Sequence, residues 1–325
     1  MDATRSSVTL QWVGDIALST QQGLPPGGLG TALAPVHGLL RGGDLTAGNL
    51  EGTLSVGGPS KCATIGTAHC FAFQAPPSTA GQLRSLGFDL VNQANNHSMD
   101  YGAPGRAQTV SALDGAGVAH IGLPGEITVL KVNGLRVAFV GFAPYPYDSD
   151  LLDIPGAQAL VRRARTRAQL VVVIIHAGAE GTAALHTPSG EEFYLGEDRG
   201  NPRTFAHAVI NAGAAAVFGS GPHVIRGIER YRGRLIAYSL GNFVGYHTLA
   251  GGGLLSESGI LRVTLDRRGR VLAGRWFSVL LSDGLPRPDP GNASARLVGP
   301  LSGGDFPAGH FRITPAGVFE LPLAR

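Results

Sequence analysis

Short apolar runs that stop abruptly at polar side chains recur along this chain. The clearest run, Phe-Asp-Leu-Val at 88–91, is soon followed by Asn95, Asn96 and His97. Asparagine and histidine are poor choices for a strand interior, so the pattern predicts a strand that leads into a polar loop. Pro104 is then placed to begin a helix.

The same kind of pattern predicts strands and helices over most of the chain. The continuous apolar run 170–175 predicts a fully buried strand, and Asn133-Gly134 between two strand-like segments is a strong hairpin signal. The predicted strands are 8–16, 45–49, 71–73, 88–91, 118–121, 127–132, 135–142, 170–175, 214–218, 224–231, 234–239, 259–266 and 271–280. The predicted helices are 31–40, 78–86, 104–116, 157–167 and 202–212. This arrangement favours an α/β fold with a mostly parallel sheet.

Metal-capable side chains lie just past several of the predicted strands. They are Asp15, Glu51, Asn96, His176 and His223. The carboxyl ends of parallel strands meet at one edge of a sheet, so these side chains are expected to converge there. Carboxylate, amide and imidazole ligands suit Mn, Fe, Zn or Mg, and Glu51 could bridge two ions. The alternative is an ordinary polar turn at each of these positions.

Other polar residues are expected to assist such a site. His97 is predicted to be a general acid, oriented by Asp100 or by a backbone carbonyl. Asn95 is expected to shape its loop, and Asn242 either supports the site or belongs to an ordinary turn. The polar excursion 182–203 is either a solvated loop or a lid that senses substrate charge.

Composition narrows the class of protein. With 325 residues, the chain can form one large core or two ordinary domains, and 43% hydrophobic with 15% charged residues indicates a compact globular protein. The net charge of +3 is spread without a basic stripe, which argues against nucleic-acid binding but is compatible with an anionic small molecule or polymer. No apolar run approaches the roughly 18 residues of a membrane span. The sequence does not address the oligomeric state.

The two cysteines, Cys62 and Cys70, lie on one loop that is rich in glycine and threonine. They are close enough in sequence to form a local disulfide, and two free thiols are the alternative. A disulfide would favour an extracytoplasmic compartment. Residues 1–7 lack the apolar core of a signal peptide, so that location would require a leader outside the sequence given. Two free thiols would be compatible with the cytoplasm.

Six motifs occur together in an order typical of one family. They are Gly14-Asp15, Asn49-Leu-Glu-Gly52, 94–102, His176-Ala-Gly-Ala-Glu180, Gly221-Pro-His-Val224 and Tyr238-Ser-Leu-Gly-Asn-Phe243. Through them the chain resembles the CapA family, which is associated with poly-γ-glutamate capsule synthesis and is similar to calcineurin-like metallophosphoesterases. The resemblance covers roughly residues 8–280. It implies a four-layer sandwich of two mixed β-sheets flanked by helices, with residues 1–282 as the CapA-type domain. The Pro/Gly-rich segment 283–325 is expected to be a C-terminal extension packed on the same domain, with short edge strands at 311–313 and 317–321.

The resemblance also implies roles for the metal-capable residues. One ion would be held by Asp15 and His223, a second by Asn96 and His176, with Glu51 as the bridge and His97 as general acid. The phosphoesterase pattern has a histidine at each of two positions that are Ala17 and Ser220 here. One or two divalent ions are therefore expected, and Glu180 is the nearest candidate to compensate for the missing ligands.

Three functions agree with this pattern. The first is a metal-dependent hydrolase or transferase of envelope or capsule metabolism, in which a metal-bound hydroxide attacks a phosphoester or a γ-glutamyl-type amide. The second is a non-catalytic factor that binds or assembles an anionic polymer. The third is an amide hydrolase of small metabolites. Fold and site class do not choose among them.

Overall fold

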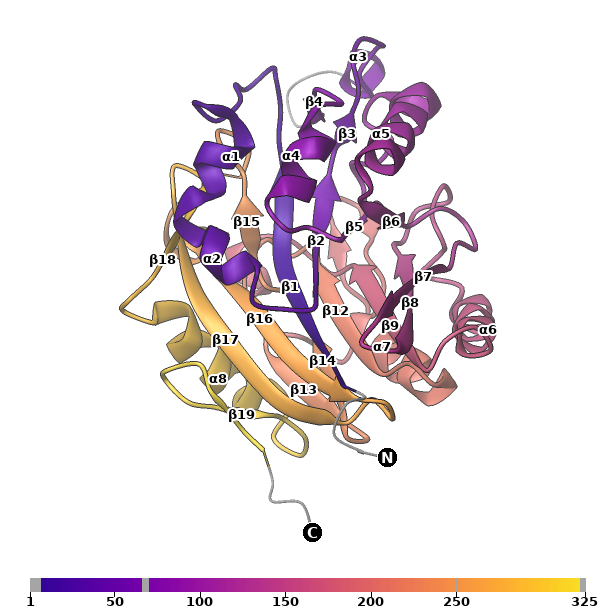
Figure 1. Cartoon of the computed structure of the whole chain (residues 1–325), viewed down its shortest axis with the longest axis vertical. Coiled ribbons are helices and arrows are strands. Elements are labelled where there is room, and N and C mark those ends of the chain that lie inside the picture. The colour runs from indigo at the N-terminus through magenta and orange to yellow at the C-terminus, as the bar shows by residue number, and fades with distance from the viewer. Residues whose placement is uncertain (1–6, 66–69, 250, 322–325) are drawn as a thin grey trace.

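The computed structural model describes residues 7–65, 70–249 and 251–321. Two β-sheets pack face to face, and helices cover the outer face of each (Figure 1). This is the four-layer α/β sandwich expected from the sequence, so the predicted fold class is confirmed. Within the described residues, no helix is both long enough and apolar enough to span a membrane.

The first sheet is built around the N-terminal strand. Its strands, in spatial order, are β18 (Leu285–Pro288), β17 (Val271–Ser282), β16 (Glu257–Asp266), β1 (Ser7–Ala17), β2 (Leu45–Glu51), β5 (Leu90–Asn92) and β6 (Ala119–Ile121), and β15 (Asn242–Val244) also pairs with β1. Strands β1, β2, β5 and β6 run parallel, whereas β16 runs antiparallel to β1. The carboxyl ends of the parallel strands therefore meet at one edge.

The second sheet has a parallel centre and antiparallel edges. Its strands, in spatial order, are β13 (Ile228–Tyr231), β14 (Arg234–Ala237), β12 (Ala216–Ser220), β9 (Leu170–His176), β8 (Leu135–Phe142) and β7 (Thr128–Val132). All seven residues of β9 are buried, as expected for an apolar strand in the middle of a covered sheet. Both hairpins, β7–β8 and β13–β14, form where the sequence predicts them.

Three hydrophobic layers hold the sandwich together. The central layer lies between the sheets and contains Trp12, whose indole Nε1 donates a hydrogen bond to the carbonyl of Gly219 at 3.2 Å. The helices that cover the first sheet are α1 (Gly28–Leu33), α2 (His37–Leu40), α4 (Thr79–Ser85) and α5 (Gly102–Ala116). The helices that cover the second sheet are α6 (Ile154–Arg165) and α7 (Pro202–Ala212). The first outer layer thus comes from the N-terminal third of the chain.

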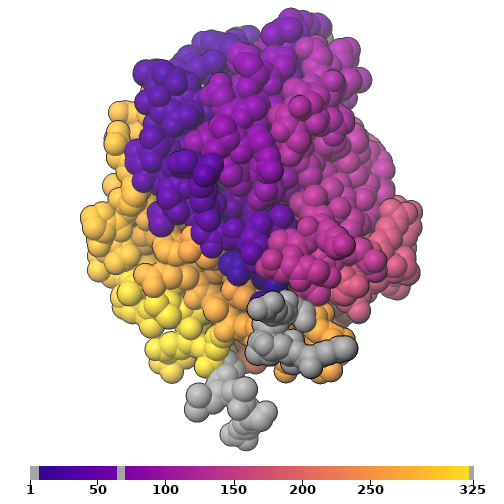
Figure 2. Space-filling model, in the orientation of Figure 1, coloured from indigo at the N-terminus to yellow at the C-terminus, as the bar shows by residue number. Residues whose placement is uncertain are grey.

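The remaining elements are short. They are the 3-10 turns η2 (Ala34–Val36), η3 (Thr182–Ala184) and η4 (Gly253–Ser256), helix α3 (Cys62–Ile65), and the strand pairs β3 (Thr53–Leu54) with β4 (Gln74–Ala75), β10 (Phe193–Tyr194) with β11 (Glu197–Asp198), and β19 (Arg312–Ile313) with β20 (Phe319–Glu320). The last pair agrees with the two edge strands expected near the C-terminus. On the face seen in Figure 2, N-terminal residues in indigo lie directly against C-terminal residues in orange and yellow.

Three local predictions are wrong. The helix expected at 31–40 is broken into α1, η2 and α2, because Pro35 has no N–H with which to continue the α-helical hydrogen bonds. The strand expected at 71–73 is irregular, and pairing begins only at Gln74. A helix that the sequence did not predict, α8 (Ala293–Asp305), contains Pro300 and is stabilised by burial of apolar side chains such as Val298.

The chain beyond residue 282 returns to the first sheet. Strand β18 pairs antiparallel with β17, so the turn at residues 283–284 joins two neighbouring strands. Helix α8 contacts β16 and β17 of the first sheet and β13 of the second. Residues 285–305 therefore pack against strands of both sheets.

Cys62 and Cys70 form a disulfide with their Cα atoms 5.5 Å apart. The bridge packs against Ala72 and Tyr101, next to the polar loop that follows β5. Beside it, the ammonium group of Lys61 lies 2.7 Å from the carboxylate of Asp100. The disulfide and Lys61 thus lie beside the segment that carries His97.

The disulfide is expected to stabilise the fold. Replacing both cysteines (Cys62→Ser with Cys70→Ser) should lower the free energy of unfolding by about 2.5 kcal/mol, because a short covalent loop restricts the unfolded chain. Urea denaturation measures the difference. The control is the same comparison in dithiothreitol, where the wild type and the double variant should coincide. Equal stability of the two proteins without reductant would contradict the prediction.

Candidate metal centre

Strand pairing brings the candidate residues to one edge of the sandwich. Asp15 on β1 lies opposite Asn49 on β2 and Asn242 on β15, while Ser220 lies opposite His176 in the second sheet. The turn before β15 approaches β1 so closely that the Asp15 N–H donates to the carbonyl of Gly241 at 3.1 Å. A Cβ atom on the preceding residue, Gly14, would collide with that carbonyl oxygen, so glycine is required there.

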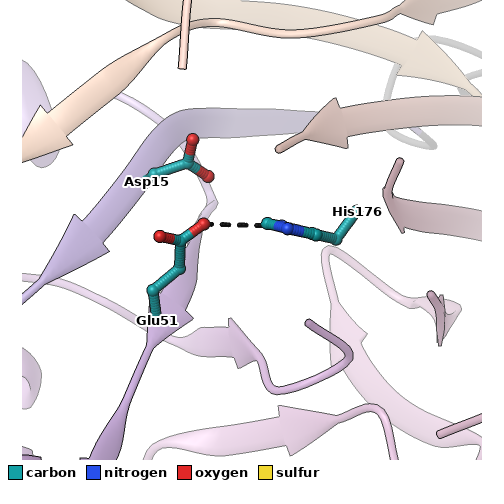
Figure 3. Close-up of side chains that lie close together, drawn as sticks. All are labelled: Asp15, Glu51 and His176. Carbon is teal, nitrogen blue, oxygen red and sulfur yellow. Dashed lines mark ion pairs between the residues drawn. The ribbon is translucent and has the colours of Figure 1, made fainter. Parts of the chain in front are cut away.

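Asp15, Glu51 and His176 form the compact core of the site. One ligand atom of each lies within 4.8 Å of the other two, and all three side chains are buried. Figure 3 shows the two carboxylates projecting from the first sheet toward the imidazole of His176, which comes from the second. His176 Nδ1 lies 3.5 Å from a Glu51 carboxylate oxygen. The site thus spans the interface between the sheets.

Asn49 is a buried residue at the centre of this group, and the sequence predictions assigned it no role. Its side-chain nitrogen donates to Asp15 at 2.9 Å and to Glu51 at 3.1 Å. The amide oxygen of Asn49 accepts hydrogen bonds from the side chains of Asn92 and Asn95, at 2.9 and 3.2 Å. Asn49 therefore holds the two carboxylates in place.

Backbone N–H groups determine the orientation of the side-chain amides of Asn92 and Asn95. The N–H of His97 donates to the Asn95 side-chain oxygen, and the N–H of Ala94 donates to that of Asn92. The side-chain nitrogens of Asn92 and Asn95 must then face the side-chain oxygen of Asn49. The side-chain nitrogen of Asn49 therefore faces the carboxylates of Asp15 and Glu51. Asn95 thus contacts both its own loop, through the His97 N–H, and Asn49 beside the carboxylates.

His223 extends the site toward solvent. Its Nδ1 lies 3.1 Å from Asp15 and 2.9 Å from the side-chain oxygen of Asn242, and its Nε2 lies 3.7 Å from Glu180. The residue has a φ of 58°, a left-handed conformation that is uncommon for residues other than glycine. Burial opposes protonation, but the charges of Glu51, Asp15 and Glu180 together raise the pKa of His223 to about 10.

The pKa values of Glu51 and His176 are both shifted in the direction that favours the neutral form. Burial, reinforced by the charge of Asp15, raises the pKa of Glu51 well above its usual value. Burial, reinforced by the charges of Arg199 and His223, lowers the pKa of His176 well below its usual value. Buried groups so perturbed, at the edge of a parallel sheet, indicate a functional site.

The donor set fits a divalent cation. One carboxylate oxygen of Glu51 and the side-chain oxygen of Asn96 are buried without a hydrogen-bond partner. Buried polar atoms are rarely left unsatisfied unless something binds them. Carboxylate and amide oxygens together with imidazole nitrogens suit Mg, Mn, Fe or Zn. The cluster whose ligand atoms lie close enough together to hold an ion is Asp15, Glu51 and His176, and His223 contacts Asp15 beside it.

His97 and Asp100 form a buried pair on the loop after β5. His97 Nδ1 lies 2.8 Å from an Asp100 oxygen that also accepts the N–H of Phe73 at 2.6 Å. The imidazole packs against the Phe73 ring, with ring centres 4.4 Å apart. Burial lowers the pKa of His97, although the neighbouring Asp100 opposes this effect. Neutral His97 then carries its proton on Nδ1, which leaves Nε2 as an acceptor.

The excursion 182–203 contributes Arg199 to the site. Glu180, just before it, accepts a hydrogen bond from Arg199 at 2.8 Å, and Arg199 also lies 3.2 Å from His176 Nε2. A buried double hydrogen bond between Arg226 and Glu192 fixes the middle of this segment. The sequence predictions treated Arg199 only as one charge of a loop, because its neighbours in sequence suggest no partner.

A pocket of about 470 Å³ lies beside the centre. Its polar wall includes Glu180, His223 and Asn242, so it is continuous with the residues around Asp15. Phe71, Tyr194, Leu249 and Leu255 contribute apolar and aromatic surface to its lining. Phe71 is 62% exposed and marks the pocket's rim.

These features define a four-layer α/β protein with a carboxylate and imidazole centre, suited to a divalent cation, at the edge of its sheets. The chain belongs to the bacterial capsule synthesis protein PGA_cap family, whose family model matches residues 9–247.

Two relatives illustrate this membership. A PGA biosynthesis protein CapA of Bacillus subtilis is 31% identical over 231 residues, which cover 64% of this chain and 55% of that protein. A capsule biosynthesis protein CapA of Bacillus anthracis is 31% identical over 181 residues, covering 52% and 43%. The chain thus spans about half the length of the curated relatives it matches. A solved 5'-nucleotidase precursor from Thermus thermophilus has a TM-score of 0.46 at 15% identity, covering 87% of this chain and 56% of that one.

Removing the central amide should weaken metal binding. We expect Asn49→Ala to lower the affinity for Mn²⁺ by about 10- to 100-fold, because groups that orient metal ligands typically contribute this much. Isothermal titration calorimetry measures the change. Asn211→Ala, at an exposed position on α7, is the matched control and should titrate like the wild type. Equal affinities for the two variants would show that Asn49 does not position the ligands.

Proposed function

We propose that this protein is a metal-dependent hydrolase or transferase of capsule-polymer metabolism, acting on a phosphoester or a γ-glutamyl-type amide. The main support is the buried group of Asp15, Glu51 and His176, which His223 extends toward a pocket. Membership in a capsule synthesis family supports the biological setting.

The charge of the site explains why a cation would be needed for an anionic substrate. Asp15, Glu51 and Glu180 bring three carboxyl groups to the centre, and they would repel a phosphate or glutamyl group that entered the pocket. Asp15, Glu51 and His223 would hold the ion. A bound divalent ion would supply Lewis acidity and an activated water at neutral pH.

His97 has the contacts that a proton-transfer residue needs. Asp100 accepts a hydrogen bond from His97 Nδ1, with 2.8 Å between the nitrogen and the carboxylate oxygen. This bond keeps the imidazole in one tautomer, with Nε2 available. Once protonated at Nε2, His97 would donate to the leaving group as general acid. Asp100 is itself fixed by the Phe73 N–H and by Lys61, so we assign it a positioning role.

Replacing the proposed acid should slow catalysis without removing metal. We expect His97→Gln to lower kcat by about 10²- to 10⁴-fold, which is the usual contribution of a general acid. The substrates are p-nitrophenyl phosphate, bis-p-nitrophenyl phosphate and γ-glutamyl-p-nitroanilide. His186→Gln, an exposed histidine paired with Asp305, is the control. Wild-type turnover by His97→Gln would rule out the acid role.

Metal should also stabilise the folded protein. A ligand that binds only the folded state raises the melting temperature as its concentration exceeds its Kd. We expect Mn²⁺ or Zn²⁺ to raise the melting temperature of chelator-treated wild type, and Asp15→Asn to abolish the shift. Differential scanning fluorimetry with elemental analysis measures both. A wild type without bound metal and without a thermal shift would sink the hydrolase proposal.

A second candidate function is a factor that binds an anionic polymer without cleaving it. Ser220, where metallophosphoesterases have a histidine, favours it, because the site has lost an imidazole ligand. Tight binding of poly-γ-glutamate, together with no turnover of any of the three substrates, would select this function.

A further inference from the structure

Arg199 is an arginine buried at the candidate metal centre, with its side chain 1% exposed. The backbone on both sides is fixed: the Arg199 N–H donates to the Glu192 carbonyl at 2.8 Å, and its carbonyl accepts from the Gly178 N–H at 3.0 Å. The guanidinium donates to Glu180 at 2.8 Å and lies 3.2 Å from His176 Nε2. A buried positive charge therefore already occupies the His176 side of the site.

Both ring nitrogens of His176 already have polar partners. A guanidinium only donates hydrogen bonds, so the electron pair of His176 Nε2 faces Arg199. The other ring nitrogen, Nδ1, lies 3.2 Å from the side-chain nitrogen of Asn49 and 3.5 Å from a Glu51 carboxylate oxygen. A histidine that binds a metal through one nitrogen needs a free electron pair there and carries its proton on the other. Held in this way, His176 offers a metal no free nitrogen.

Ser220 removes a further donor from the same side. Its hydroxyl lies 3.2 Å from the Ile175 carbonyl, to which it donates, and 3.4 Å from His176 Nδ1. On the Asp15 side, the side-chain oxygen of Asn242 accepts a hydrogen bond from His223 Nδ1 at 2.9 Å, which leaves His223 Nε2 for an ion, and one Glu51 oxygen has no hydrogen-bond partner. Available donor atoms therefore remain on the Asp15 side and not at His176.

Arginine suits the place of a second cation, because its charge persists when it is buried.

We propose that Arg199 takes the place of a second metal ion in this protein. The site holds one divalent ion, on the side of Asp15, Glu51 and His223, and the guanidinium supplies the second positive charge. His176 is a hydrogen-bond partner of Arg199 rather than a ligand. This proposal concerns the number of ions and does not depend on which bond, if any, the protein cleaves.

The test is the stoichiometry of Mn²⁺, measured by elemental analysis and by isothermal titration calorimetry on the full chain. We expect one ion per chain in the wild type and in Ser220→His, because Arg199 still blocks the second side. The double variant Arg199→Met with Ser220→His should bind two ions. Arg203→Met is the control: this arginine lies over the Phe306 ring and should leave one ion. Circular dichroism checks that each variant is folded.

Single substitutions of the proposed ligands provide an independent measurement. We expect Asp15→Ala to weaken Mn²⁺ binding by about 100-fold or more, and His176→Ala to change it by less than about 3-fold. Two ions in the wild type, or equal losses in Asp15→Ala and His176→Ala, would overturn the proposal. Binding of one ion without hydrolysis of any substrate would support this inference and contradict the proposed hydrolase function. Binding of two ions together with hydrolysis would contradict this inference and support the hydrolase function.

Discussion

The burial of two carboxylates, Asp15 and Glu51, is the constraint on which the rest of the site depends. Their exposed fractions are 0% and 1%, and an unpaired buried charge costs several kcal/mol. Each neighbour offsets part of that cost: Asn49 donates to both carboxylates, His223 faces Asp15, and the charge of Arg199 acts on Glu51. The compensation is incomplete, since one Glu51 oxygen has no hydrogen-bond partner. A divalent cation would complete it.

Much of this arrangement follows from local sequence pattern. The buried strand β9, the parallel strands that end near Asp15 and Glu51, and both tight hairpins have the apolar periodicity or turn residues that predict them. The polar residues that come directly after such strands must then meet at one edge. For this reason the sequence predicts that Asp15, Glu51 and His176 lie close together, as they do.

What the sequence could not predict depends on contacts between distant segments. Asn49 looks like an ordinary strand residue, and only the orientation of Asn92 and Asn95 makes its amide a donor to the carboxylates. Arg199 lies on an irregular segment, so its direction is set by Glu192 and Gly178. Helix α8 forms despite Pro300, since burial of its apolar face outweighs poor helix propensity. Tertiary packing decides all three cases.

The contact between Gly14 and Gly241 has a consequence for how this site can change in evolution. Any side chain at position 14 would strike the Gly241 carbonyl, and Gly241 itself has a φ of 70°, where a Cβ atom would lie 2.9 Å from the Glu257 carbonyl oxygen. A substitution at either glycine would displace the backbone that carries Asp15 or the one that leads to Asn242. Both glycines therefore constrain the same junction: side chains can vary in the loops around the pocket, whereas the backbone where β1 meets β15 tolerates few substitutions.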